Sequence, residues 1–199
     1  MLIAFEGIDG SGKSTQAKLL ADHLSKLGAK VELTREPTQD GSAGILLKKE
    51  LGSVGNTPDP RYLQLLFVAD RAWHVSNFIR PKTGDGAVVI TDRYIDSTRA
   101  YGLASGLEMR WLTQINSKFP AADITFILDI TPEEAAKRLA SRSGKKELFD
   151  DVKTFRKLRS AYLRISKRGG GYHIIDSSRG MEEIRNDIAA IADAALRKQ

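Results

Sequence analysis

The sequence contains no cysteine, which excludes disulfide bonds, thiolate metal ligands and cysteine nucleophiles. It also has no apolar run approaching the roughly 18 residues that a membrane-spanning helix needs. Its first residues enter an apolar segment directly, without the basic and apolar regions of a secretion signal. These absences predict a cytoplasmic protein that has no membrane partner.

The charge balance is basic, with 31 lysines and arginines against 25 aspartates and glutamates and a formal net charge of +6. Such a balance suits either a nucleic acid or a small polyanionic substrate. The basic residues are spread over the separate segments 48–49, 137–146 and 153–168, and no motif typical of RNA or DNA binding is present. We therefore expect a small polyanionic substrate and no nucleic-acid partner.

Short apolar runs alternate with amphipathic helical patterns along the chain, which predicts a parallel sheet with crossover helices. A length of 199 residues, 41% of them hydrophobic, predicts a single domain over 1–199. Strands are expected at 2–6, 30–34, 87–91, 124–130 and 172–175, and helices at 13–27, 60–80, 132–141, 148–167 and 181–198. The expected fold is thus a three-layer α/β/α arrangement around a five-stranded parallel sheet.

The stretch "FEGIDGSGKST" contains the pattern G-x-x-x-x-G-K-[ST] between an apolar strand and a helix. Its glycines let backbone N–H groups turn toward phosphate oxygens, and the helix N-terminus adds the positive end of a dipole. The lysine reaches the outer phosphates and the serine hydroxyl can ligate Mg²⁺. The pattern predicts a P-loop NTPase whose ATP-binding residues are Gly7, Ile8, Asp9, Gly10, Ser11, Gly12, Lys13, Ser14 and Thr15. The alternative is a glycine-rich turn before an ordinary helix.

The stretch "VVITDRYIDSTRAYG" begins with an apolar strand that ends at Asp92. Ligands of open parallel sheets bind at the carboxyl ends of strands, so Asp92 can hold magnesium or its water. If the chain then turns helical, Arg93, Ser97 and Tyr101 lie at i, i+4 and i+8 on one face. Such a row could clamp a phosphate and bind a sugar or base. A solvated face with Arg93 paired to Asp96 is an equal alternative.

A second pair of residues lies in "LLFVADRAWHV", where Phe67 and Arg71 are one helical turn apart. A phenylalanine in an apolar helix more often belongs to the core. An aromatic ring beside a guanidinium, however, is a poor core pair and a good seat for a nucleobase, which it can both stack on and hydrogen-bond. Both readings remain open at this point.

The motifs "FEGIDGSGKST", "TREP", "LLFVADRAWHV" and "DRYIDSTRAYG", in this order and at these distances, resemble thymidylate kinases. The resemblance covers essentially the whole chain. It implies a P-loop fold with a small lid at about 141–150 and transfer of the terminal phosphate of ATP to dTMP. It also implies Mg²⁺ as cofactor and a homodimer, for which the helical pattern over 60–80 is a candidate surface.

The resemblance also implies roles for individual residues. Asp9 would lie beside the deoxyribose 3′-hydroxyl and the neighbouring arginine, while Phe67 would stack on thymine and Arg71 would read its carbonyl edge. Arg93 would clamp the acceptor phosphate. The base and sugar would be lined by Ser97, Thr98 and Tyr101, the last near C2′, where it would disfavour a ribonucleotide.

The lid residues follow from what the phosphate loop lacks. Its variable positions 8–11 contain no basic residue, so a cation that stabilises the transition state must come from elsewhere. Arg138 and Arg142 are four residues apart, and Gly144 breaks the helix before Lys145 and Lys146. We expect Arg142 as the catalytic lid residue beside Lys13, Asp9 and Arg93, with Lys145 and Lys146 as helpers, and we expect Arg138 to contact ATP. A solvated basic helix end is the alternative.

The sequence departs from many bacterial members of the family after "TREP", where Thr38, Gln39 and Asp40 replace a pair of glycines. This departure leaves two roles open for Arg35. It could give the second contact to the acceptor phosphate, which we expect from the segment 35–49, or it could pack against Glu36 at the end of the sheet.

Overall fold

The computed structural model describes residues 1–52, 58–142 and 151–197. Its five strands form one parallel sheet in the order β2-β3-β1-β4-β5. The strands are β1 (Leu2–Glu6), β2 (Val31–Arg35), β3 (Val88–Asp92), β4 (Ile124–Asp129) and β5 (Tyr172–Asp176). Each lies within one residue of its predicted range, because a strand covered on both faces reads as an apolar run. The predicted five-stranded parallel sheet is therefore confirmed.

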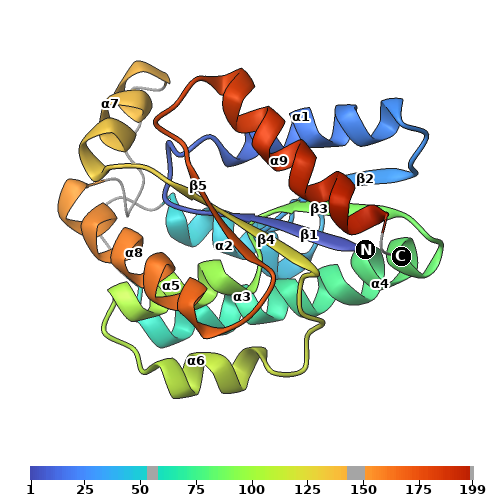
Figure 1. Cartoon of the computed structure of the whole chain (residues 1–199). Helices are drawn as coiled ribbons and strands as arrows, with labels where there is room; N and C mark the ends of the chain where they lie inside the picture. The colour runs from blue at the N-terminus through green and yellow to red at the C-terminus, as the bar shows by residue number, and fades with distance from the viewer. Residues whose placement is uncertain (53–57, 143–150, 198–199) are drawn as a thin grey trace.

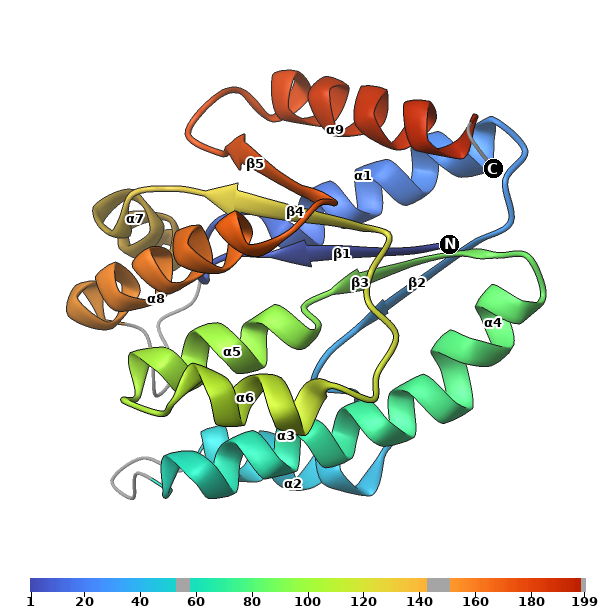
Figure 2. The ribbon, with the colours of Figure 1, turned by 60° about the horizontal axis from the view of Figure 1, so that its bottom comes forward.

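Helices cover both faces of this sheet, as Figures 1 and 2 show. They are α1 (Lys13–Lys26), α2 (Ser42–Leu51), α3 (Pro60–His74), α4 (Arg80–Gly84), α5 (Ile95–Ala104), α6 (Met109–Asn116), α7 (Pro132–Arg142), α8 (Val152–Ile165) and α9 (Met181–Leu196). A π-helical turn, Val75–Ile79, joins α3 to α4, and a 3-10 turn, Ser166–Arg168, follows α8. Of these helices, α2, α4 and α6 were not predicted, and α5 was predicted only on the condition that the chain turns helical after Asp92.

The two faces of β1 belong to different cores. Ile3 and Phe5 pack with α1 and α9, whereas Leu2 and Ala4 pack with the π-helical turn and the start of α5. In Figure 2, α1 and α9 accordingly lie on one side of the sheet and α3 to α6 on the other. This alternation follows from the two-residue period of a strand. It confirms the three-layer α/β/α fold.

Helix α8 forms a third apolar cluster with α5 and α7. Phe155, Leu158 and Tyr162 of α8 are buried there. The start of α7 is capped, since the hydroxyl of Thr131 accepts a hydrogen bond of 3.3 Å from the N–H of Glu134. Most of the predicted lid, from 143 to 150, lies outside the described residues.

Over the described residues, no helix is both long enough and apolar enough to cross a membrane.

The carboxyl ends of β1 and β3 lie side by side, with Phe5 in register with Asp92. Between β1 and β4 the chain changes the direction in which strands are added to the sheet. Open α/β sheets bind ligands at such a point, which directs attention to the loops that follow these strands.

Candidate active site

The loop between β1 and α1 requires glycine at specific positions. Gly7 and Gly10 have φ values of +140° and +81°, which L side chains rarely adopt. A Cβ atom at Gly7 would lie 2.6 Å from the carbonyl oxygen of Leu128, and one at Gly10 would lie 2.6 Å from that of Ala135. The loop is thus tightly packed against β4 and α7. It leads directly into the N-terminus of α1, where an anion is stabilised by the helix dipole.

Lys13, the first residue of α1, is buried and folds back over the loop. Its Nζ donates a hydrogen bond of 3.0 Å to the carbonyl oxygen of Ile8 and lies 3.7 Å from Oδ1 of Asp9. Burial lowers the pKa of Lys13, as does the nearby charge of Arg93, while Asp9 opposes both effects. A buried ammonium group with one partial counter-charge is well suited to an incoming phosphate.

Asp9 is held by an ion pair and by a phenol. Its Oδ1 accepts a hydrogen bond of 2.6 Å from Nη2 of Arg93, and its Oδ2 accepts one of 3.0 Å from the hydroxyl of Tyr101. Burial opposes ionisation of Asp9, but Arg93, Lys13 and these hydrogen bonds together lower its pKa. The acid in the phosphate loop is therefore an ionised partner of Arg93. Arg93 does not pair with Asp96, which pairs with Arg99 at 2.8 Å.

Arg93 itself occupies a left-handed backbone conformation, with φ at 72°. Such a conformation costs on the order of 1–3 kcal/mol for a residue other than glycine. Backbone and side-chain bonds hold it in place. The N–H of Arg93 donates to the carbonyl oxygen of Phe5 at 2.9 Å, and the hydroxyl of Thr91 donates to the carbonyl oxygen of Arg93 at 2.8 Å. The turn after β3 thus aims the guanidinium at the loop after β1.

Ser14 and Asp92 meet at the mouth of the loop, where the serine hydroxyl donates to Oδ2 of Asp92. The other carboxylate oxygen, Oδ1, is buried and has no hydrogen-bond partner among the described residues. A hydroxyl and a carboxylate are ligands suited to Mg²⁺, which keeps waters and phosphate oxygens as its other ligands. The pair therefore fits this ion. No group of three or more His, Cys, Asp or Glu side chains suited to a metal occurs in the part of the chain that the structure describes.

A cavity of about 700 Å³ joins these features. It is lined by most of the predicted site residues, contributed by the loop, the start of α1, α3, the turn after β3 and α5. Those residues are Asp9, Gly10, Gly12, Lys13, Ser14, Thr15, Phe67, Asp92, Arg93, Ser97, Thr98 and Tyr101. Arg35 also lines the cavity and is exposed, which favours the acceptor-phosphate role among its two alternatives.

Arg71 lies behind the cavity wall and is only 1% exposed. Its Nη1 donates to Thr98 at 2.8 Å and to Asn116 at 2.6 Å, while Nε and Nη2 donate to Glu36 and Nη2 also to the carbonyl oxygen of Tyr94. These bonds occupy all five N–H groups of the guanidinium. Direct contact of Arg71 with a base edge stays a prediction, and it requires one of these partners to be released.

Arg138 also lies away from the cavity lining. Its Nη2 donates to the carbonyl oxygen of Ser177 at 3.0 Å, and its Nε pairs with Glu134 at 3.3 Å. Arg142 ends α7, and its side chain lies outside the described part of the chain, as do Lys145 and Lys146. The predicted roles of these lid cations stay predictions.

Two residues that help to hold Arg93 were not found from the sequence. Glu6 is fully buried at the end of β1, and Tyr162 of α8 is 1% exposed. Both touch the network around Arg93, since the hydroxyl of Tyr162 accepts from Nη1 of Arg93 at 3.3 Å and donates to Glu6 at 3.2 Å. An acid that closes the apolar run "LIAFE" was a visible signal for Glu6. Nothing in the pattern of α8 distinguishes Tyr162 from a core residue.

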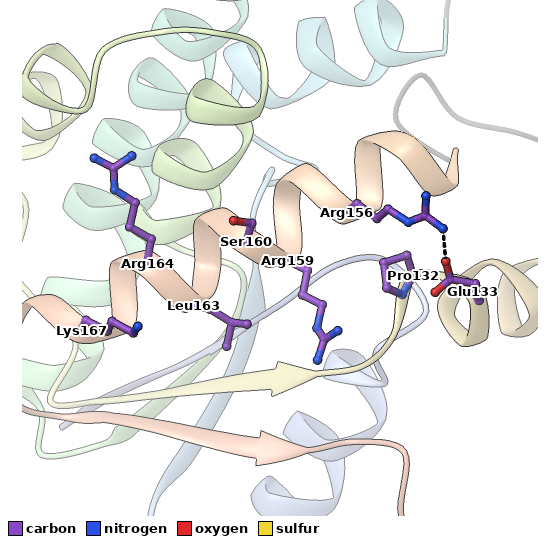
Figure 3. A pocket seen from close by; sticks show the side chains of 8 residues that line it. All are labelled: Pro132, Glu133, Arg156, Arg159, Ser160, Leu163, Arg164 and Lys167. Atoms are coloured by element: carbon purple, nitrogen blue, oxygen red, sulfur yellow. Dashed lines mark hydrogen bonds and ion pairs between the residues drawn. The ribbon is translucent and has the colours of Figure 1, made fainter.

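A second hollow, of about 600 Å³, lies over α8 and the start of α7. Figure 3 shows several basic side chains along it. Two of them are already paired, Arg156 with Glu133 at 2.5 Å and Arg159 with Asp129 at 2.7 Å. It contains no residue of the phosphate loop. The cavity around Lys13 is therefore the candidate active site.

The parallel sheet, the phosphate loop and its Ser–Asp pair define a P-loop nucleotide-binding protein, and the anion-binding cluster facing the loop points to phosphoryl transfer. A sequence model described as thymidylate kinase matches residues 5–188. The chain is 42% identical over 196 residues to a "Probable thymidylate kinase" of Pyrobaculum calidifontis, covering 98% of this chain and 97% of that protein.

Proteins of the same description from Thermococcus onnurineus and Pyrococcus horikoshii are 39% and 40% identical over 206 and 198 residues. The alignments cover 100% and 98% of this chain and 100% and 96% of those proteins. The chain belongs to the thymidylate kinase family. This membership confirms the family predicted from the four motifs, and the predicted dTMP kinase activity, a phosphotransferase activity, follows from it.

Proposed function

We propose that this chain transfers the γ-phosphate of ATP to dTMP, giving ADP and dTDP for dTTP synthesis. One observation carries the assignment of residues. A single cavity joins the phosphate loop to the cluster of Asp9, Arg93 and Tyr101. A donor and an acceptor phosphate bound at these two places would face each other, and such proximity is the main contribution of the protein to phosphoryl transfer.

On the donor side, the backbone N–H groups of 7–15 and the ammonium group of Lys13 bind the ATP phosphates. Ser14 and Asp92 would hold Mg²⁺. Bound there, the ion would offset negative charge on the outer phosphates. Oδ1 of Asp92, which has no hydrogen-bond partner among the described residues, supports this assignment.

On the acceptor side, Arg93 binds the phosphate of dTMP and Phe67 stacks on thymine. Ser97, Thr98 and Tyr101 line the base and sugar. Asp9 keeps Arg93 in position and accepts from the deoxyribose 3′-hydroxyl. The attacking oxygen of the acceptor phosphate is already ionised, so no general base is needed. That oxygen forms the new P–O bond as the bond between the γ-phosphorus and the ADP oxygen breaks.

As the transferred group moves, Lys13 stays within reach of it, and lid cations led by Arg142 would close on it. In other nucleotide enzymes one such arginine contributes about 10³–10⁵ in rate. Arg138 would contact ATP after its guanidinium separates from Glu134.

The single-domain arrangement over 1–199 and the cytoplasmic location also stay predictions.

The test is ADP formation from ATP and magnesium with nucleoside monophosphates offered one at a time. A strong preference for dTMP supports the whole assignment. Turnover with another acceptor only would overturn the base-binding roles of Phe67 and Arg71, while ATP binding without turnover would favour a regulatory module. Lys13→Ala and Arg93→Ala should each lower turnover by orders of magnitude with unchanged circular dichroism; near-normal activity of either variant contradicts its role.

A homodimer is supported by an apolar stripe along α3. Tyr62, Leu65 and Trp73 are 41%, 49% and 38% exposed and lie on one face of that helix. A contiguous exposed apolar surface commonly marks a protein interface. Leu65→Glu should convert the dimer to a monomer in analytical ultracentrifugation, whereas Leu27→Glu, at a residue 64% exposed beyond α1, should not. A monomeric unmodified chain would refute the proposal.

A further inference from the structure

Glu6 is a buried carboxylate that receives four hydrogen bonds from two other elements. Its Oε1 accepts from the N–H groups of Tyr94 and Ser97, at 2.9 and 3.0 Å. Its Oε2 accepts from the hydroxyls of Ser97 and Tyr162, at 2.7 and 3.2 Å. Ser97 lines the cavity of the proposed acceptor site, but Glu6 itself does not, so the acid has another role.

The first pair of bonds caps a helix from a distant strand. Tyr94 is the N-cap residue of α5 and makes no side-chain cap of its own. Glu6, 88 residues earlier in the chain, supplies the missing acceptor. A carboxylate at a helix N-terminus also interacts favourably with the dipole. Glu6 thereby fixes the chain directly after Arg93, where the backbone has its left-handed conformation.

The second pair of bonds reaches the guanidinium itself. Nη1 of Arg93 donates to the hydroxyl oxygens of Ser97 and Tyr162, at 3.0 and 3.3 Å. Because arginine can only donate, both hydroxyls must accept from Arg93 and direct their own protons elsewhere. Glu6 is the acceptor for both protons. Burial raises the pKa of Tyr162, so its phenol keeps the proton that it donates.

The two ends of the guanidinium are therefore held differently. Nη2 pairs with the carboxylate of Asp9 at 2.6 Å. Nη1 is held by the hydroxyls of Ser97 and Tyr162 and by the carbonyl oxygen of Gly7 at 3.5 Å, all of them neutral, and Glu6 contacts it only through the two hydroxyls. This arrangement orients the guanidinium without a second carboxylate in direct contact, so less of its charge is neutralised before a phosphate arrives.

We propose that Glu6 and Tyr162 are positioning residues, which set the turn and the guanidinium of Arg93 for the acceptor phosphate. This inference rests on the proposed function, because Arg93 is its target. It assigns no contact between either residue and a substrate. Loss of either one should therefore weaken use of the acceptor and leave use of ATP nearly unchanged.

The experiment compares Tyr162→Phe and Glu6→Gln with the unmodified chain in steady-state kinetics, varying dTMP and ATP separately. Hydrogen bonds to charged groups are strong enough for a rise of about 10- to 100-fold in KM for dTMP. KM for ATP should change less than about twofold. The matched control is Tyr172→Phe, because the hydroxyl of Tyr172 donates to Asp96 of α5 at 2.9 Å and not to the Arg93 network. Its kinetics should equal those of the unmodified chain.

A second comparison separates positioning from a general loss of structure. In an Arg93→Lys background, Tyr162→Phe should lower kcat/KM for dTMP further by less than about twofold. If Tyr162 acts through the guanidinium of Arg93, the effects of the two substitutions are not additive. The same fold loss in both backgrounds, equal rises in KM for both substrates, or an unchanged KM for dTMP would each overturn the proposal.

Failure of the proposed function can be distinguished from failure of the positioning inference. If the unmodified chain uses another monophosphate, the same kinetic comparison is made with that acceptor. If it has no turnover, the side-chain N–H signals of Arg93, assigned in nitrogen-15 NMR from their loss in Arg93→Lys, replace the kinetics. Faster solvent exchange of these signals in Tyr162→Phe than in Tyr172→Phe is expected, and equal exchange would refute positioning.

Discussion

Replacing Glu6 by glutamine should change how the stability of the protein depends on pH. Burial raises the pKa of Glu6 from 4.5 to about 7, with the negative charge of Asp96 adding to the shift and Ser97 and Arg93 opposing it. The carboxyl is fully buried. Glutamine has nearly the same shape and can still accept from the backbone N–H groups, but it has no proton to lose in this range.

The sign follows from linkage. The folded state binds the Glu6 proton more tightly than the unfolded state, so the contribution of this group falls as pH rises from about 4.5 to about 7. At 1.36 kcal/mol per pKa unit, the total loss is about 3 kcal/mol. This loss is absent at pH values below the pKa of Glu6 in the unfolded state, and it is complete above the pKa in the folded state.

Urea unfolding of both proteins, followed by circular dichroism between pH 4.5 and 8.5, measures this effect. Titrations of other groups largely cancel in the difference between the two unfolding free energies. That difference should move by about 3 kcal/mol in favour of glutamine across the range. A change in unfolding free energy that comes from altered hydrogen bonds and does not depend on pH shifts this difference equally at every pH. A difference that does not vary with pH would refute the reasoning.

Three further substitutions test other parts of the site. Arg71→Ala removes the arginine partner of the buried Glu36, which keeps only its contact of 3.0 Å with His74, so urea unfolding should register a loss of about 3–5 kcal/mol; a loss below about 1 kcal/mol would contradict the buried network. Gly10→Ala forces a Cβ to 2.6 Å from a carbonyl oxygen of Ala135 and should cost more stability than Gly12→Ala, which has no neighbour within 4 Å. Phe67→Leu removes ring stacking and should raise KM for dTMP about tenfold while KM for ATP stays unchanged; equal changes would place Phe67 elsewhere.

Features carried by neighbouring residues were predictable from the sequence. The phosphate loop is one contiguous motif whose glycines are required by its own backbone path. The strands are apolar runs because helices cover both faces of the sheet. By contrast, α6 was missed because it is eight residues long and buries only Leu112 and Asn116, too few positions to give a helical period.

The assignment of partners depended on residues far apart in the chain. Helical spacing correctly put Phe67 and Arg71 on one helix, but it could not indicate that Glu36, 35 residues before Arg71, occupies the guanidinium. Nor could it decide between Asp9 and Asp96 as the partner of Arg93. Spacing along a helix fixes only the direction in which a side chain projects. The packing of other elements decides what it meets.

The sequence by itself therefore determined the family and the sheet, and it predicted the place of phosphate binding, because these features depend on local patterns. Only the tertiary structure decided how Arg93 is held. The acid that organises its turn lies at the end of β1 and the phenol that it orients lies on α8, 156 residues later. Such a network forms only when strands and helices pack, since burial makes unpaired polar groups costly and selects the arrangement in which each finds a partner.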